Sequence, residues 1–397
     1  MPLDRRWSVT LGLSFVAAAL LALLGGGNAR ADRPALSWSP WTRAPSPYAS
    51  TNLDTLERRV ATACGASEDG LRALARTIVA RTSADQKVPD LETLDWEKRA
   101  SGEPHPWPRT WTITGRSLEP ERTTALLETW LRASRHAELR RCGVADGVAP
   151  NGNRVLVVVA VDALADLAPI RRTARVGEWL SVEVRLRAPV RDPRTLVLGP
   201  SGVPRALLTS TDGASVRARF APDQSGMFTV QVLGDVGEGS RPLIEATVFA
   251  DVEPPTHPDD ERAPGEGVEG GSSNEGEGLA SMVDAARTAS GRAVLQRSQV
   301  LDDVARKHAL RMSATQELAH DVGDGNPTER LATAGVGGVE VGENVGRARS
   351  VAMAHRQIWN SPSHRLNLLS DRFLRAGYAV VRDEHGEAWV VEEFAGR

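Results

Sequence analysis

The segment Trp359–Leu369, which reads WNSPSHRLNLL, gathers a proline, a histidine and two asparagines within eleven residues. The residues before it predict a helix that begins after Ser350, because apolar side chains recur there at helical spacing. This stripe comprises Val351, Ala354, Ile358 and Trp359. Pro362 marks the expected end of the helix, since proline lacks the backbone N–H that a helix interior requires.

Patterns on either side of this segment predict a helix and a hairpin. An earlier helix is expected over residues 300–312, where apolar residues again recur at helical spacing. Downstream, residues 376–382 and 387–394 are strand-like, and the turn Asp383–Gly386 between them predicts a terminal hairpin. Helices that precede a hairpin predict an α+β domain.

Three polar residues fall at the ends or connections of these elements: His320, Glu343 and His364. Two neutral imidazoles and a carboxylate suit a divalent metal such as zinc, which can keep a water molecule at an open position. A carboxylate beside that water can act as a base. The spacing fits no compact metal motif, so a solvated histidine pair and a turn glutamate explain the same residues. His308 and His355 lie inside expected helices, where an ordinary structural histidine is the simpler interpretation.

Four motifs follow one another in this region. They are Ala319-His320, Gly342–Val345, Trp359–Leu369, and the closing pair Gly377–Val380 with Phe394-Ala395. Together they make residues 279–396 strongly resemble the CAP superfamily of cysteine-rich secretory proteins, antigen 5 and pathogenesis-related proteins (the SCP domain), in its bacterial exported form. The resemblance implies an α/β/α sandwich and a cleft that holds two histidines and two glutamates. It also implies a set of cleft-supporting side chains: Asn344, Trp359, Ser361 and Asn367.

The match at the cleft covers three of its four polar residues. His320, Glu343 and His364 fit the expected positions, but the segment Asn360–Pro362 stands where other members carry the second acid. The adjacent acids at 392 and 393 lie on an expected strand, so they point to opposite faces and at most one can face the cleft. The resemblance therefore implies a metal-capable cleft and weakens any hydrolytic mechanism that needs both acids.

Two classes of function are compatible with these residues. In the first, the cleft, with or without a divalent metal such as zinc, binds a small molecule, lipid, peptide or cell-envelope component. In the second, a metal-dependent hydrolase, His320 and His364 hold the ion and Glu343 is the catalytic residue that activates water. A third class, an extracellular adhesive or scaffolding protein, rests on the central domain described below. The residues do not decide whether the protein is an enzyme.

The N-terminus carries the pattern of an export signal. Arg5 and Arg6 precede an apolar run over residues 11–24, and Ala29–Ala31 offers small residues for cleavage. This run is short for a membrane span, which needs roughly 20 residues, although an uncleaved anchor is the alternative. We expect cleavage of residues 1–31, a secreted or periplasmic location, and no membrane span afterwards.

Charge and cysteine content narrow the class of protein further. The 397 residues carry 48 Lys+Arg against 51 Asp+Glu, a formal net charge of -3, so nucleic acid is not an expected partner. The two cysteines, Cys64 and Cys142, predict one disulfide in an oxidising compartment. Two buried free thiols are the alternative.

Composition divides the remaining chain into a multidomain α+β protein. Residues 253–278 are rich in proline, glycine and acids, which predicts a solvated linker before a CAP domain at 279–397. Residues 165–252 contain short alternating segments separated by turns, which predicts an immunoglobulin-like β-sandwich. The clearest alternation occurs at 178–187, 216–220 and 228–232.

Residues 46–162 repeat the element order of the C-terminal domain. Leu71–Arg76 is similar to Leu301–Arg306, and Cys142–Val144 introduces a hairpin like the final one. No glutamate stands in Thr114–Ser117, where a counterpart of Glu343 would fall. This order predicts a CAP-like copy without its site, and an unrelated small α+β domain is the alternative.

Overall fold

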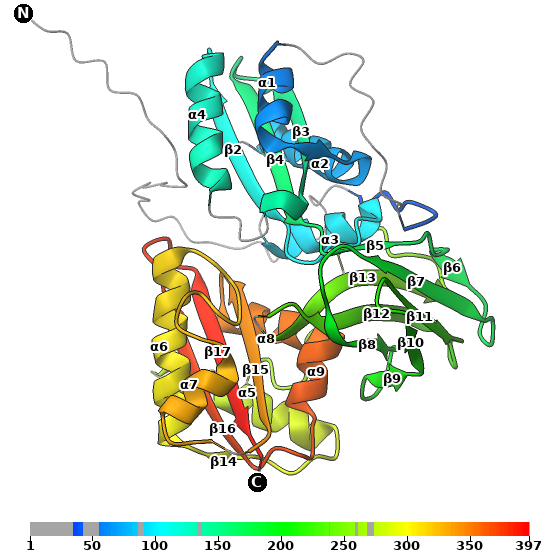
Figure 1. The fold of residues 1–397 in the computed structure, drawn as a ribbon, viewed down its shortest axis with the longest axis vertical. Helices are drawn as coiled ribbons and strands as arrows, with labels where there is room; N and C mark the ends of the chain where they lie inside the picture. Colours follow the sequence, from blue (N-terminus) through cyan, green and yellow to red (C-terminus); the bar gives the residue numbers. More distant parts are fainter. Residues whose placement is uncertain are drawn as a thin grey trace, which may run out of the picture.

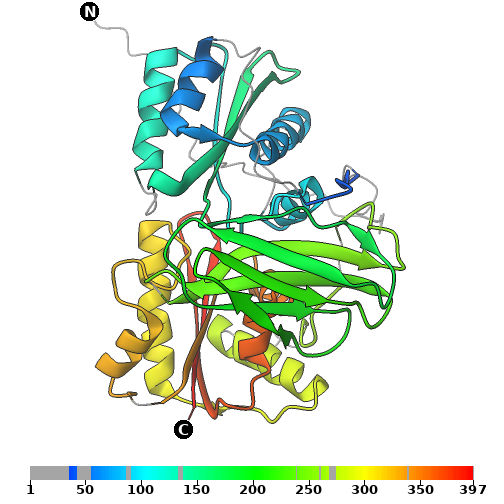
Figure 2. The ribbon, with the colours of Figure 1, turned by 45° about the vertical axis from the view of Figure 1, so that its right-hand side comes forward.

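The computed structural model describes residues 35–42, 55–85, 91–132, 137–237, 239–258, 261–267, 274–337 and 339–396. The expected export signal, residues 1–31, lies outside these ranges. The described elements form four sheets, and the N-terminal sheet with its helices lies above both the central strands and the C-terminal domain in two views (Figure 1 and Figure 2). The chain is therefore a mixed α+β protein, as predicted.

The C-terminal domain contains the expected helices and the terminal hairpin. Its elements are α5 Glu275–Ala289, β14 Gln296–Arg297, α6 Gln299–Thr315, α7 Pro327–Thr333, β15 Val341–Ala348, α8 Val351–Asn360, α9 Pro362–Leu368, β16 Arg375–Arg382 and β17 Ala388–Ala395. The strand order is β14-β16-β17-β15, with β17 antiparallel to both neighbours and β14 parallel to β16. Strand β17 is thereby central and buried along its whole length.

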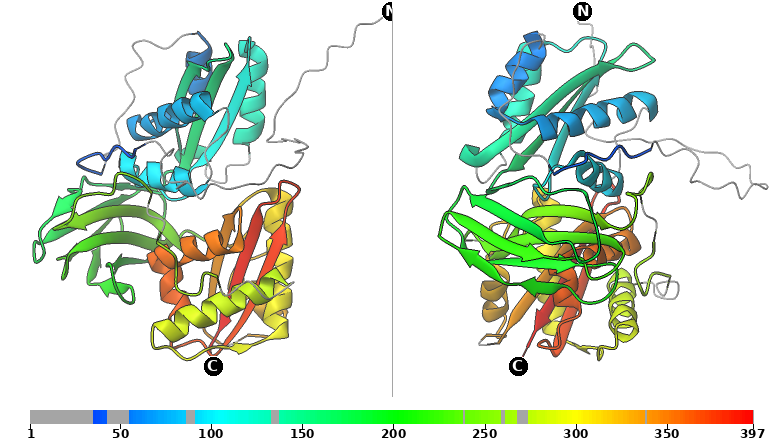
Figure 3. Two further views of the ribbon diagram at one scale, coloured as in Figure 1. Left: turned by 180° about the vertical axis from the view of Figure 1, so that it is seen from behind. Right: turned by 90° about the vertical axis from the view of Figure 1, so that its right-hand side faces the viewer.

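Helices cover both faces of this sheet. Helix α6 packs Ala309 and Met312 against Trp389 and Val391 of β17, in one apolar cluster. Helices α5 and α8 pack on the opposite face, where residues such as Ile358 meet Val390. Figure 3, left, shows α5 lying across the face opposite to α6. The three layers are those that the resemblance implied.

Pro362 begins a helix as well as following one, which differs from the prediction. Helix α8 ends at Asn360, Ser361 lies between the helices, and Pro362 occupies the first turn of α9. Proline fits this position because its missing N–H has no partner in the first turn and its fixed φ is helical. The short helix α9 carries His364.

Part of the expected solvated linker packs on the C-terminal domain. Helix α5 already begins at Glu275, where the side chain of Asn274 accepts a hydrogen bond from the Gly276 amide at 3.0 Å. Upstream, Glu266 accepts from Arg356 of α8 at 2.8 Å, and Ala263 is 3% exposed. Composition alone predicted that this acidic stretch is solvated. The ion pair with Arg356 of α8 instead holds it against the C-terminal domain.

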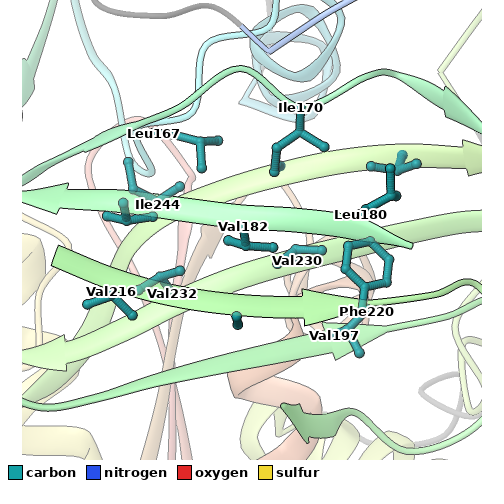
Figure 4. Close-up of a cluster of buried hydrophobic side chains, with 14 of the residues drawn as sticks. Leu167, Ile170, Leu180, Val182, Val197, Val216, Phe220, Val230, Val232 and Ile244 are labelled. Atoms are coloured by element: carbon teal, nitrogen blue, oxygen red, sulfur yellow. The ribbon is translucent and has the colours of Figure 1, made fainter. Parts of the chain in front are cut away.

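The central region folds into two sheets around one core. Its strands are β5 Ala165–Leu167, β6 Thr173–Ala174, β7 Leu180–Leu186, β8 Arg191–Leu198, β9 Arg205–Leu207, β10 Thr209–Thr211, β11 Ser215–Phe220, β12 Gly226–Asp235 and β13 Ser240–Ala250. They pair in the orders β10-β11-β7-β5 and β6-β13-β12-β8-β9. Side chains from both sheets, such as Val182 and Val230, share one apolar cluster (Figure 4). Its immunoglobulin-like character remains a prediction.

The N-terminal region has the same sheet order as the C-terminal domain. Its elements are α1 Thr55–Cys64, β1 Ala66–Ser67, α2 Asp69–Asp85, α3 Leu91–Ser101, β2 Arg109–Gly115, α4 Pro120–Leu131, the 3₁₀ turn Ala137–Leu139, β3 Arg140–Val148 and β4 Arg154–Asp162. The order β1-β3-β4-β2, with β1 parallel to β3 and the other pairs antiparallel, corresponds strand by strand to β14-β16-β17-β15. The predicted disulfide joins Cys64 to Cys142, with 6.1 Å between their Cα atoms.

A glycine supports helix packing at the same place in both regions. An added Cβ on Gly143 of β3 would lie 2.0 Å from the backbone of Leu71 in α2. An added Cβ on Gly377 of β16 would lie 2.2 Å from the backbone of Leu301 in α6. The shared topology and close approach are what a duplication would produce, and superposition of residues 50–162 on 279–396 tests that prediction.

Gly377→Ala is expected to lower the free energy of unfolding of the C-terminal domain by about 1–3 kcal/mol. The new methyl group would force α6 away from β16, because the nearest atoms belong to the helix backbone. Urea denaturation followed by tryptophan fluorescence measures the change. Gly346→Ala is the matched control, since its Cβ would lie 3.5 Å from Ile358 in ordinary contact. Equal effects of the two substitutions would contradict the packing argument.

Candidate functional site

The structure brings His320 and Glu343 into direct contact. His320 lies in the connection after α6, and Glu343 lies on β15. His320 Nδ1 is 2.7 Å from Glu343 Oε1. A carboxylate accepts a hydrogen bond, so Nδ1 carries a proton, and in the neutral tautomer with this bond Nε2 carries the lone pair. Nε2 has no hydrogen-bond partner among the described residues.

Two asparagines attach the helix of His364 to the strand of Glu343. Asn344 Nδ2 donates to the backbone carbonyl of His364 at 3.1 Å. Asn367 Nδ2 donates to the carbonyl of Glu343 at 3.1 Å and to Asn344 Oδ1 at 3.1 Å. These bonds fix α9 against β15, so Asn344 and Asn367 connect the segments that carry Glu343 and His364.

Trp359 and Ser361, the other two expected supporting residues, contact Arg365 and Gln231. The half-buried ring of Trp359 lies beneath the guanidinium of Arg365, whose Cζ is 4.0 Å from the ring centroid. Ser361 Oγ accepts a hydrogen bond from Gln231 Nε2 of β12 at 3.3 Å. Gln231 Oε1 also accepts from the Ser363 amide at 3.0 Å, so this pair of contacts holds α9 on the central domain.

Glu343 is a buried anion held by an arginine that sequence reasoning missed. Arg330 of α7 donates from Nη2 to Glu343 Oε2 and from Nη1 to the carbonyl of His320, the latter at 2.7 Å. Burial raises the pKa of Glu343, but the hydrogen bond from His320 and the charge of Arg330 outweigh it and lower the pKa to about 2. No local pattern marks Arg330, because it meets Glu343 only through the packing of α7 on β15.

The two adjacent acids of β17 point to opposite faces, as predicted. Glu393 shares Arg330 with Glu343, at 3.4 Å from Nη2. Burial and the negative charge of Glu343 raise the pKa of Glu393 well above its usual value. Glu392 instead accepts from Asn344 Nδ2 at 2.8 Å, and burial raises its pKa to about 7. Glu393 is therefore the second acid beside the site, although it contributes from β17.

His308 also lies beside Glu343, although the sequence favoured an ordinary helix histidine. Its Nε2 is 3.0 Å from the carbonyl of Ala319 and 3.8 Å from Glu343 Oε2. Its Nδ1 is 2.8 Å from Asp324 Oδ2. His308 lies on the buried face of α6, at helical spacing from Leu301 and Met312. This spacing was the one feature of the sequence that indicated a buried position for His308. Both ring nitrogens are engaged, so His308 positions the connection that carries His320.

His364 is a neutral, buried imidazole. Its side chain is 9% exposed, and Nε2 is buried without a hydrogen-bond partner among the described residues. Burial, with a smaller contribution from His320, lowers its pKa to about 3. A buried nitrogen without a partner is costly, so this atom is suited to a ligand that accepts its lone pair or donates a proton to it.

A tryptophan from the N-terminal region contacts the site. Trp107 lies between α3 and β2, with its ring centroid 6.4 Å from that of His320 at an interplanar angle of 70°. Arg241 of β13 lies over the same ring, with Cζ 4.9 Å from its centroid. Trp107 has a φ of 54°, a left-handed conformation that is uncommon outside glycine. The N-terminal region thus contacts His320 through Trp107, and the central domain contacts Trp107 through Arg241.

Comparison with known proteins gives the class of the C-terminal domain. Residues 280–394 match the family described as CAP, the cysteine-rich secretory protein family, so this part of the chain is a CAP domain. No curated protein matches the chain.

Three solved structures illustrate the similarity. An outer surface protein from Borrelia burgdorferi has 18% identity, 30% coverage of this chain, 90% of its own and a TM-score of 0.29. An extracellular SCP-domain protein from Bacillus anthracis has 17% identity, coverage of 59% and 86%, and a TM-score of 0.29. A cysteine-rich secretory protein from Staphylococcus aureus has 15% identity, coverage of 60% and 83%, and a TM-score of 0.27.

Across the described ranges, no helix is both long enough and apolar enough to cross a membrane.

Proposed function

We propose that this is an exported binding protein whose CAP domain takes up its ligand at His320 and His364. The observation that carries the proposal is the buried His364 Nε2, which lacks a partner among the described residues and belongs to a neutral ring. The second ring, His320, is oriented by Glu343 so that its Nε2 lone pair is available. Two imidazole nitrogens suit a divalent ion of the zinc type, and His320 contributes to the lowered pKa of His364. Within the described ranges, His320, Glu343 and His364 do not by themselves bring three ligand atoms within 4.8 Å of one another, so the ion would have to draw the two rings together.

Such an ion would be held by the two histidines, with Glu343 and Arg330 as outer partners. When bound, it would supply an electrophilic centre for a carboxylate or phosphate oxygen of a lipid, peptide or cell-envelope ligand. Glu343 orients His320, and Arg330 neutralises Glu343 and fixes the backbone of His320. Orientation by a carboxylate is the usual arrangement for a metal-binding histidine.

The geometry supports binding more than hydrolysis. Both oxygens of Glu343 are engaged, one by His320 and one by Arg330. A carboxylate with a pKa of about 2 is a weak base, because a general base works best with a pKa near the working pH. Glu393 is fully buried, and burial raises its pKa well above the usual value, so it also offers no accessible base.

Zinc binding by the full mature chain tests the proposal. We expect His364→Ala and His320→Ala each to lose one equivalent of zinc relative to wild type, measured by equilibrium dialysis with elemental analysis. His385→Ala, in the exposed hairpin turn, is the matched control and should keep wild-type stoichiometry. Equal zinc content in all four proteins would remove the ion from this site. Peptide or ester hydrolysis that disappears in Glu343→Gln would favour the hydrolase instead.

Trp107→Ala is expected to speed zinc uptake at this site by roughly tenfold. The reason is that only the molecules in which Trp107 has moved away from His320 can bind zinc, and the substitution makes all molecules competent. The indole ring lies next to His320, with 6.4 Å between the ring centroids, and would be removed. Stopped-flow competition with a zinc indicator measures the rate. Trp130→Ala is the control, since that ring also carries an arginine, Arg109, at 5.0 Å. An unchanged rate in Trp107→Ala would show that the ring does not limit access.

A further inference from the structure

The N-terminal region holds a buried cluster of potential metal ligands outside the CAP site. Glu68, Glu103 and His105 are 1%, 2% and 1% exposed. Each offers one ligand atom, and these atoms all lie within 4.8 Å of one another. Two carboxylates and an imidazole form a donor set that divalent ions of the zinc type accept.

Local structure fixes each of the three side chains. Glu68 immediately precedes α2, where its amide donates to the Cys142 carbonyl at 3.0 Å, next to the disulfide. Glu103 follows the end of α3, where Gly102 has a φ of 83° and the Glu103 amide donates to the Lys98 carbonyl at 3.2 Å. This glycine-dependent helix end turns the chain so that Glu103 and His105 face Glu68.

The hydrogen bonds leave one oxygen of Glu68 and one of Glu103 without a partner, and they place His105 Nδ1 beside Glu103. Arg141 Nη1 donates to Glu68 Oε2 at 3.2 Å, and Glu68 Oε1 has no partner among the described residues. Glu103 Oε1 accepts from the His105 amide at 3.1 Å, and Glu103 Oε2 is likewise without a partner in the described part of the chain. His105 Nε2 is 3.0 Å from the Ala165 carbonyl, so Nε2 carries the proton. His105 Nδ1 faces Glu103 Oε1, so either a second proton on the ring or a metal ion lies between the two atoms. Burial lowers the pKa of His105, but the charge of Glu103 outweighs it and raises this pKa, so the proton and the metal ion compete for one position.

The geometry points to a second, structural metal site, in which Glu68, Glu103 and His105 hold one divalent ion of the zinc type. The backbone carbonyl that fixes the other nitrogen of His105 is the outer partner typical of metal-binding histidines. The ion would provide a partner for Glu68 Oε1 and Glu103 Oε2, the two buried oxygens that lack one. A buried polar atom without a partner lowers the stability of a protein.

The site would fasten three segments of the chain. Glu68 belongs to the N-terminal sheet region, His105 lies in the connection to β2, and Ala165 begins β5 of the central domain. The same connection carries Trp107, two residues after His105, to the ring of His320. An ion at Glu68, Glu103 and His105 therefore helps to hold Trp107 over the CAP site.

Zinc stoichiometry of the mature chain in a His320→Ala/His364→Ala background tests this inference apart from the proposed function. After chelation and dialysis, we expect this background to rebind one zinc per chain, His105→Gln added to it to bind none, and Glu68→Gln to bind at least about tenfold more weakly. His355→Gln is the matched control, since His355 is also fully buried and bonds a backbone carbonyl. Circular dichroism checks that each variant is folded.

Two results would overturn the inference. One is a folded background that binds no zinc, and the other is unchanged zinc content after His105→Gln. Nitrogen-15 NMR of the His105 ring gives an independent readout: a metal-bound Nδ1 is expected with zinc, whereas two protonated nitrogens under zinc saturation would identify an ion pair with Glu103. If the background loses its fold, wild type and His105→Gln are compared directly, with loss of one equivalent expected.

Discussion

Arg330→Met is expected to lower the free energy of unfolding of the CAP domain by about 3–5 kcal/mol, because it leaves Glu343 as a buried anion without its main cation. Glu343 is 4% exposed and Arg330 is 9% exposed, so water replaces little of the lost interaction. Arg330 also donates to the carbonyl of His320, whose connection would loosen as well. Urea denaturation of the mature chain, monitored through the CAP-domain transition, measures the change.

A double substitution separates the charge from the packing. Arg330→Met with Glu343→Gln removes both charges, and a buried pair replaced in full is often close to neutral, so most of the lost stability should return. Arg306→Met, on the exposed side of α6, is the control and should change stability by less than about 0.5 kcal/mol. If Arg330→Met behaves like the control, Arg330 does not stabilise Glu343.

Cys64→Ala with Cys142→Ala is expected to destabilise the N-terminal region by about 2–4 kcal/mol, because the disulfide restrains the unfolded chain across a separation of 78 residues. Both cysteines are buried, at 1% and 0% exposure, and loss of their sulfurs also opens space beside Leu127 and Leu156. Thermal unfolding measures the shift.

Reduced wild type distinguishes the crosslink from the packing. It retains both sulfur atoms, so it should lose the restraint but keep the packed volume. We expect its transition to lie between those of the oxidised protein and the double variant. The CAP-domain transition serves as the internal control, because neither cysteine lies in that domain. An unchanged N-terminal transition in reductant would show that the disulfide adds no stability.

Local patterns were sufficient for two helices and the terminal hairpin of the CAP domain. Helical spacing predicted α6 and α8, and the turn at Asp383–Gly386 predicted the β16–β17 hairpin. Alternation along the final strand also placed Glu392 and Glu393 on opposite faces. These features depend on a few neighbouring residues, so the sequence contains them directly.

Patterns were insufficient where a residue's role depends on a distant partner. Composition indicated a solvated linker through Glu266, which instead pairs with Arg356 of α8. Helical spacing did not place His308 beside Glu343, from which its Nε2 lies 3.8 Å. Pro362 was expected only to end a helix, but it also begins α9.

The sequence by itself determined the order of α6, α8 and the final hairpin, the two cysteines available for a disulfide and the identity of His320, Glu343 and His364 as chemically capable residues. Only the tertiary structure decided their states: Arg330 makes Glu343 a paired anion, and burial makes His364 neutral. It also brought Trp107 to His320 and gathered Glu68, Glu103 and His105. The physical reason is that burial and charge pairing depend on which distant residues exclude water from a group, and this is settled only when the chain has folded.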